Sequence, residues 1–178
     1  MAKKVEFRKN RYFLLHPMRV VLVASRSPEG KKNVMSAAWC MPVNDDPFMV
    51  ALALGSDSVT ARNIRKTGEF TLNVPGQSLL KSVKMCGSMH GDRIDKARKA
   101  GLSYEKGRTV MAPIIEECMA HLECRVWKTI PSDGVDLFIG DVKAAYADPK
   151  MIRKVWEARA KVLLHLGGNK FAIPKSIE

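Results

Sequence analysis

The chain has 178 residues, of which 46% are hydrophobic, and a formal net charge of +12 at pH 7. This length and composition suit one domain with a buried core and argue against intrinsic disorder. No apolar run approaches the roughly 20 residues of a membrane span, and the charged start MAKKVEFRKNR is unlike an export signal. We therefore expect a cytoplasmic protein without a membrane partner, and a single domain over residues 1–178 in which 1–11 and 175–178 are extensions.

The positive charge is spread along the chain. Lys and Arg residues occur from Lys3 to Lys175, and no stretch interleaves them with aromatic residues as a stacking platform for nucleic acid would. Binding to a phosphate backbone favours clustered basic residues. The sequence therefore predicts no nucleic-acid partner, and its basic surface favours an acidic partner or an anionic ligand.

Short, β-branched apolar runs dominate the first part of the chain. RVVLVASR (19–26) and NVMSAAWCMPV (33–43) flank a turn marked by Pro28 and Gly30, and together they predict a hairpin. PFMVALAL (47–54) predicts a third strand.

The middle of the chain alternates short helices with a strand. Asp57 or Ser58 would cap a helix that Gly68 ends, before EFTLNVP resumes strand character. Two further helices are predicted, one over about 77–85 and one from Asp92 as N-cap to Gly101.

Two long strand-like segments follow. AHLECRVWKTI (120–130) and VDLFIGDVKAAYA (135–147) are joined around Ser132–Gly134 at hairpin spacing. Strands at this density, with helices between only some of them, do not fit the regular alternation of a parallel sheet. An antiparallel barrel fits better, and its rim of loops and short helices would hold a ligand.

The cysteines do not predict a metal site. Cys40, Cys86, Cys118 and Cys124 lack CxxC spacing, so we expect reduced thiols. Cys118, His121 and Cys124 sit in CMAHLECRVW, which has strand character, and no second pair of ligands follows at zinc-finger spacing.

Spacing assigns no catalytic residue. The sequence has no GxGxxG after a strand, no GxxxxGK and no HExxH. Cys86 is a candidate thiolate only because it lies beside Gly87 and near a predicted helix start, where a thiol pKa falls.

Hydroxyl groups and backbone amides suited to a phosphate recur along the predicted rim. They lie at Ser36, at 56–60 beside a helix N-terminus, and at Gly87–Ser88. Trp39 follows Ser36 by three residues and would face the other side of a regular strand. The two side chains can act together only if the strand is irregular near Ala37–Ala38.

Several segments, in this order, carry a resemblance to a known family. They are KNVMSAAWCMPVNDDPFMVALAL, DSVTARNIRKTGEFTLNVPG, CGSMHGDRIDKARKAGL, APIIEECMAHLECRV and LFIGDV. Together, from about Tyr12 to Pro174, they resemble the flavoredoxin and ferric-reductase group of flavin-reductase-like, FMN-binding split-barrel proteins. The resemblance implies a mainly β fold, a Greek-key antiparallel split β-barrel with a few short flanking helices. It also implies a homodimer that binds FMN non-covalently near the dimer interface.

The resemblance further implies a set of cofactor-binding positions. Trp39 would lie against the isoalloxazine, Thr60 would take the phosphate or ribityl end, and Lys96 would stabilise negative charge on the reduced flavin. Residues 86–88 would form a wall of the pocket, and Phe171 would close it. The predicted FMN-binding residues are Met35, Ser36, Ala37, Ala38, Trp39, Ser58, Thr60, Asn63, Cys86, Gly87, Ser88, Lys96 and Phe171.

The stretch CGSMHGDRIDK (86–96) is then interpreted as a cofactor corner. Gly87 and Gly91 would allow close backbone approach. Asp92 would cap the helix, with Lys96 four residues on and on the same helix face.

One departure from the family pattern bears on the reaction. Many flavin reductases of this superfamily carry Gly-Asp-His before the strand that here reads LFIGDV, and the histidine helps to admit the nicotinamide. Val135 stands at that position here.

The predicted function is that of an FMN-dependent oxidoreductase. It is either a flavoredoxin-like electron carrier, serving a redox-partner protein or a ferric complex, or an NAD(P)H-dependent flavin or ferric reductase, with NADH or NADPH as transient donor. Val135 favours the carrier. The alternative is a non-catalytic module that binds flavin or haem.

Overall fold

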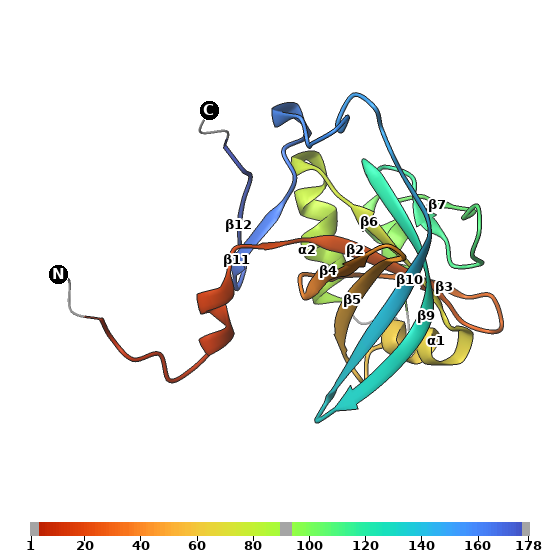
Figure 1. Ribbon diagram of the computed structural model, residues 1–178, viewed down its shortest axis with the longest axis horizontal. Helices are drawn as coiled ribbons and strands as arrows, with labels where there is room; N and C mark the ends of the chain where they lie inside the picture. Colours follow the sequence, from red (N-terminus) through yellow and green to blue (C-terminus); the bar gives the residue numbers. More distant parts are fainter. Residues whose placement is uncertain (1–3, 90–93, 176–178) are drawn as a thin grey trace.

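The computed structural model describes residues 4–89 and 94–175. In chain order, the strands that lie in these ranges are β1 (Met18–Arg19), β2 (Val21–Arg26), β3 (Lys32–Ala37), β4 (Cys40–Asp45), β5 (Phe48–Gly55), β6 (Glu69–Val74), β7 (Tyr104–Glu105), β8 (Ile114–Ile115), β9 (Ala120–Ser132), β10 (Val135–Ala147), β11 (Leu164–Gly167) and β12 (Lys170–Ala172). Figure 1 shows the long strands as one body, from which an arm made of the N-terminal segment, β11 and β12 extends.

The helices are short and flank the strands. They are α1 (Val59–Thr67), α2 (Leu80–Ser88) and α3 (Lys96–Ala100), with single 3₁₀ turns η1 (Arg11–Leu15), η2 (Gln77–Leu79) and η3 (Ala158–Ala160). Within the described ranges, none of these helices has both the length and the apolar character needed to cross a bilayer.

Seven strands form one antiparallel sheet in the order β3-β2-β6-β9-β10-β5-β4. Its two edge strands are consecutive in the chain and are separated only by Ala38 and Trp39, so the two edges meet at this corner. The backbone fixes the corner, because Cys40 N donates to Ala38 O at 3.0 Å and Ala53 N donates to Trp39 O at 2.9 Å. The sheet therefore curls into a barrel that is joined at one corner and split elsewhere. The predicted Greek-key antiparallel split barrel is confirmed.

Both predicted hairpins are present, β2–β3 around Pro28–Gly30 and β9–β10 around Ser132–Gly134. The segment 33–43 is not one strand, because the corner at Ala38–Trp39 divides it into β3 and β4. This division is the irregularity that the spacing of Ser36 and Trp39 required.

The helix boundaries correct two expectations. Ser58, rather than Asp57, caps α1 through its hydroxyl, which accepts from Ala61 N, and Gly68 ends the helix in the left-handed conformation, as predicted. Helix α2 runs three residues past its predicted end, to Ser88. Helix α3 is capped by Asp95, whose carboxylate accepts from Arg98 N at 3.1 Å, while Asp92 lies outside the described residues.

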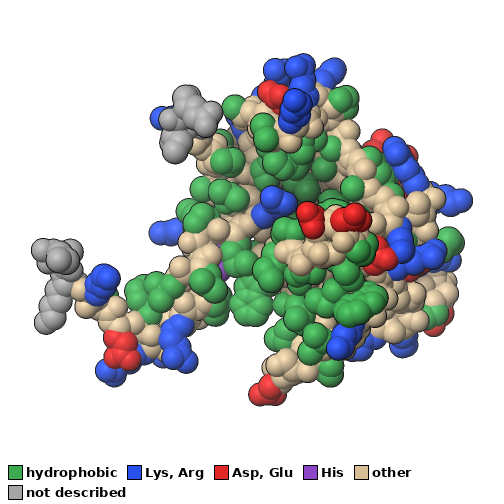
Figure 2. Space-filling model, viewed as in Figure 1, with side chains coloured by type: hydrophobic (Ala, Val, Ile, Leu, Met, Phe, Trp, Pro, Cys, Tyr) green, Lys and Arg blue, Asp and Glu red, His purple; other side chains and the backbone are tan. Residues whose placement is uncertain are grey.

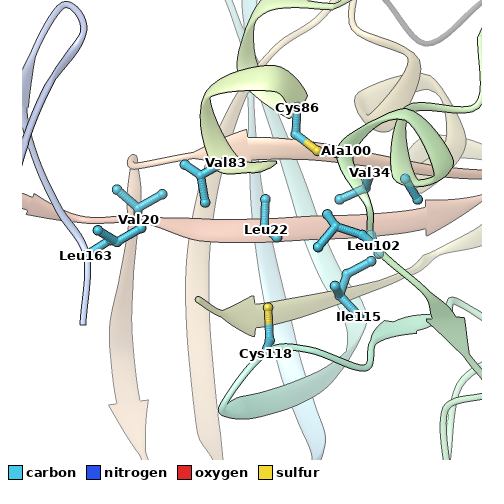
Figure 3. Packing of buried hydrophobic residues seen from close by; sticks show 12 residues of the cluster. Val20, Leu22, Val34, Val83, Cys86, Ala100, Leu102, Ile115, Cys118 and Leu163 are labelled. Carbon is cyan, nitrogen blue, oxygen red and sulfur yellow. The ribbon is translucent and has the colours of Figure 1, made fainter. Parts of the chain in front are cut away.

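Among the described residues, the two larger of three hydrophobic clusters hold the elements around the site. One fills the barrel around Phe70 and Phe138, which are fully buried. Gly140 allows this packing, since a Cβ there would lie 2.6 Å from Phe70 Cζ. The other cluster joins the barrel to α2 and α3, with Leu22 and Val83 facing each other across it (Figure 3). Helix α2 is thereby held against β3, beside the corner of the barrel.

Candidate functional site

Three cavities adjoin at the corner between β3 and β4. The α1 cavity, of about 170 Å³, is lined by Asn33, Met35, Asp57–Thr60, Cys86–Met89 and Lys96. The η1 cavity, of about 400 Å³, is lined by Tyr12, Phe13, His16, Met35–Trp39, Ala53–Gly55, His165 and Gly168. The β11 cavity, of about 240 Å³, is lined by Val20, Ser36–Ala38, Val83, Lys84, Gly87, Ser88, His165, Gly168, Asn169 and Phe171. Shared residues connect the three into one composite pocket.

The α1 cavity has the properties of an anion site. Thr60 lies in the first turn of α1 and is 1% exposed, and its Oγ1 accepts a hydrogen bond from Asn33 Nδ2 at 2.7 Å. Because an amide NH₂ only donates, this bond leaves the Thr60 hydroxyl hydrogen available to a ligand. A helix N-terminus with a hydroxyl donor favours a phosphate or carboxylate.

A buried lysine faces the same cavity. Lys96 opens α3 and is only 6% exposed, with Nζ 3.5 Å from the carbonyl oxygen of Cys86. Buried lysines are rare unless their charge is compensated. The cavity also receives Asp57, so a cation and a carboxylate both line it.

The η1 cavity offers a flat aromatic wall. Trp39 is 43% exposed, and its ring meets that of Tyr12 edge to face, with centroids 5.5 Å apart. Planar ligands favour such walls, because aromatic faces bury large apolar areas with little loss of side-chain freedom.

The β11 cavity is closed by the hairpin of β11 and β12. Phe171 lies on this hairpin, and Lys84 of α2 places its Nζ 5.5 Å from the centroid of the Phe171 ring. His165 lines both this cavity and the η1 cavity.

The fold brings together most of the predicted cofactor-binding residues. Those that line the composite pocket are Met35, Ser36, Ala37, Ala38, Trp39, Ser58, Thr60, Cys86, Gly87, Ser88, Lys96 and Phe171. Asn63 lines none of the three cavities; it is buried, and its Nδ2 donates to Ser25 Oγ at 3.2 Å. The Ser36 hydroxyl donates to Val83 O, so this side chain ties β3 to α2.

The structure alters the interpretation of the segment 86–88. Gly87 and Ser88 lie in the last turn of α2, where the unpaired backbone groups are carbonyls rather than the amides that a phosphate needs. Packing within the protein does not require glycine at position 87, because a Cβ there would find Ser36 Cβ at an ordinary 3.6 Å, and the close approach of Gly87 to a cofactor stays a prediction. Gly91 lies outside the described residues.

The cysteine chemistry is also resolved. Burial raises the pKa of the Cys86 thiol to about 11, and the nearby charge of Lys96 only partly opposes this. Cys86 is therefore a protonated wall residue at neutral pH rather than a thiolate nucleophile. Cys118 and Cys124 belong to different hydrophobic clusters, and His121 Nδ1 lies 2.9 Å from Asn73 Oδ1.

Sequence reasoning missed several residues that line the pocket, namely Tyr12, Phe13, His16, Lys84, His165 and Asn169. Two of them, His165 and Asn169, lie close to Phe171, which only the family resemblance had indicated. No sequence pattern could indicate these residues. The strands that bring the arm to the barrel, such as β1 and β11, have only two to four residues, which is too short for a recognisable periodicity.

Fold and site together define a split-barrel protein with a composite ligand pocket at the corner of its edge strands. Residues 13–172 match the flavin reductase like domain family, and the chain belongs to that family.

Relatives and solved structures extend this result. An uncharacterized protein of Archaeoglobus fulgidus is 36% identical over 128 residues, which are 72% of this chain and 71% of that protein. The flavoredoxin from Methanosarcina acetivorans is similar in structure, with a TM-score of 0.87 and 27% identity over 99% of this chain and 94% of that one. An FMN-binding domain of a flavin reductases-like enzyme from Shewanella baltica has a TM-score of 0.80 and 28% identity, covering 94% of this chain and 92% of that one.

Proposed function

We propose that this chain is an FMN-dependent oxidoreductase. One observation carries the proposal. At the end of β3, the composite pocket joins an anion site, lined by Thr60 and Lys96, to a flat aromatic wall formed by Trp39. FMN has a phosphate at one end and a planar ring at the other. The likeness to a flavoredoxin and to an FMN-binding domain supports the same ligand.

Different residues of the pocket would bind different parts of FMN. Thr60 and the N-terminus of α1 would bind the phosphate, and Trp39 would pack against the isoalloxazine. Phe171 would close the pocket from β12. Bound FMN would supply reversible two-electron chemistry, and the protein would set its position and its electrostatic surroundings. Lys96 lines the α1 cavity with Thr60, so its charge would act on the phosphate. Because that cavity adjoins the η1 cavity at Met35, we also expect the charge to favour the reduced, anionic ring.

Within this class we propose a flavoredoxin-like carrier that keeps its FMN and exchanges electrons with a redox-partner protein or a ferric complex. Val135, which stands where many reductases have a histidine, is the register partner of Gly55, and Gly55 lines the η1 cavity. Val135 therefore lies next to a residue of the pocket lining, and an apolar side chain there would offer no polar contact to a nicotinamide. A reductase that uses NADH or NADPH is the second candidate.

The visible spectrum of the purified protein, recorded before and after anaerobic additions, tests these proposals. Yellow protein bleached only by dithionite or a reduced protein partner supports the carrier. Bleaching by NADH or NADPH within a catalytic time supports the reductase. A bound flavin that is not reduced by dithionite, by a reduced protein partner or by NAD(P)H would favour the non-catalytic module. A haem spectrum would show that the cofactor is haem and not FMN.

We also propose a homodimer. Trp39 is partly exposed, and Met41 and Val43 of edge strand β4 are 60% and 43% exposed. Exposed apolar side chains along an unpaired edge favour burial against another surface. The cytoplasmic location stays a prediction from the sequence.

A further inference from the structure

Two histidines from distant parts of the chain meet beside the composite pocket. His16 follows η1 and His165 lies in β11, and their ring centroids are 5.1 Å apart. Pairing of β1 with β11 brings the two segments together. Gly167 permits the contact, because its φ is +112° and a Cβ there would lie 3.1 Å from the Phe13 ring of η1.

A backbone carbonyl orients each ring. His16 Nδ1 lies 3.2 Å from Tyr12 O, and His165 Nε2 lies 2.8 Å from Gly168 O. Because a carbonyl only accepts, these nitrogens carry the protons of the neutral rings. The other nitrogens, His16 Nε2 and His165 Nδ1, are then free to take up a proton and to give it to a ligand.

The other residues that line the η1 and β11 cavities offer few alternatives as proton donors. Among the described residues that line the η1 and β11 cavities there is no Asp or Glu, and the other ionisable side chains are Lys84 and Tyr12. Histidine is the side chain whose ordinary pKa lies near neutrality. His165 lines both cavities, so it would touch a substrate held in either one.

We propose that His165, paired with His16, is the proton donor for organic two-electron acceptors of the quinone class. The inference rests on the proposed function. A quinone becomes a hydroquinone by gaining two electrons and two protons. Bound FMN in its reduced state would supply a hydride, which accounts for both electrons and one of the two protons. His165 Nδ1 would give the second proton to a quinone oxygen, and it would be reprotonated from solvent or from His16, whose ring centroid lies 5.1 Å away. A ferric complex takes an electron and no proton, so its reduction does not need this residue.

Two acceptors test the proposal with the same reduced protein. Wild type, His165→Gln and His16→Gln are loaded with FMN, reduced anaerobically, and mixed rapidly with 1,4-benzoquinone or with ferricyanide. We expect His165→Gln to slow quinone reduction at least ~10-fold, because a positioned acid contributes a factor of that size or more. The ferricyanide rate stays within about twofold of wild type, since no proton transfer limits it. Leu166→Gln, an exposed neighbour in β11 that lines neither cavity, leaves both rates unchanged.

An unchanged quinone rate in His165→Gln, or an equal fall with both acceptors, would overturn the proposal. His165→Asn provides a second variant if the first does not fold. FMN affinity is measured in each protein: wild type that binds no FMN removes the proposed function, whereas normal binding with an unchanged quinone rate removes only the role of His165.

A second readout needs no FMN. Nitrogen-15 NMR of the cofactor-free protein reports which ring nitrogen carries the proton. We expect Nε2–H at His165 and Nδ1–H at His16. The opposite tautomer at His165, with the proton on Nδ1 and none on Nε2 to donate to Gly168 O, would contradict the proposal.

Discussion

At the scale of single residues, the anion site depends on two buried side chains, Lys96 and Thr60. Lys96 is only 6% exposed, so it is not a solvated lysine on the outer face of α3. Charges partly shielded from water interact more strongly than exposed ones. Substitutions at these positions should therefore change ligand binding and not only stability.

Lys96→Met should lower the reduction potential of bound FMN and weaken its binding. The reason is that the lysine charge stabilises the anionic reduced ring more than the neutral oxidised ring. Spectroelectrochemical titration against wild type measures the potential. Lys99→Met, on the same helix but exposed, is the control. A potential that does not fall would separate Lys96 from the flavin.

Thr60→Val should cost on the order of 1.5 to 3 kcal/mol of FMN affinity, because it removes a hydrogen bond to a charged group. Thr67→Val is the matched control, since Thr67 is in the same helix and its hydroxyl donates to Asn63 O instead. Fluorescence titration of FMN gives both dissociation constants. Equal constants for Thr60→Val and wild type would place the phosphate elsewhere.

At the scale of elements, a buried carboxylate holds the loop before β8 against the barrel. Glu123 of β9 is fully buried. It accepts hydrogen bonds from the backbone amides of Arg108, Thr109 and Val110, and from the Tyr146 hydroxyl. Burial alone would raise the pKa of this carboxyl, but these hydrogen bonds outweigh it and lower the pKa to about 2.

The free energy of unfolding should therefore fall at acidic pH, because Glu123 becomes protonated. Its folded pKa of about 2 lies below the ordinary value of 4.5, so its contribution is complete above pH 4.5 and is lost as the pH falls toward 2. Glu123→Gln should be less stable at pH 7 and lose less stability over that pH range. Urea unfolding at several pH values measures both effects. Parallel pH curves for the two proteins would contradict this role.

The sequence predicted the elements with strong periodicity, but not those that depend on long-range pairing. The alternating pattern of β9 and β10 and the turn residues between them fixed that hairpin locally. Strands β1, β11 and β12 have two to four residues, too few for a pattern, and they form only because distant segments meet. Residues 56–60, including Thr60, were singled out by their hydroxyls beside a helix N-terminus, and the pairing of Trp39 with Ser36 by their spacing, whereas Lys96 and Phe171 came from the family resemblance alone. His16 and His165 lacked even that signal.

At the scale of the whole molecule, the arm carries apolar side chains that the rest of the chain does not cover. Leu14 and Leu15 of η1 are 65% and 77% exposed. Figure 2 shows hydrophobic side chains along the arm and on the adjoining barrel surface. Because η1 also lines the pocket through Tyr12 and Phe13, assembly and cofactor binding should be linked.

Leu15→Asp should weaken the proposed dimer and, by mass action, FMN binding as well. The exposed position of Leu15 means that the fold of one chain should survive the change. Sedimentation with and without FMN measures the effect. Val155→Asp, also exposed but in the segment between β10 and η3, is the control. Monomeric wild type with full FMN occupancy would contradict the linkage.

The most direct test of the central claim is an equilibrium titration of the cofactor-free protein with FMN, followed by flavin fluorescence and absorbance. The proposed pocket predicts saturable binding of one FMN per chain, with affinity reduced in Thr60→Val and Lys96→Met and unchanged in Thr67→Val and Lys99→Met. Absence of saturable binding, or equal affinity in all five proteins, would contradict the assignment of the composite pocket to FMN.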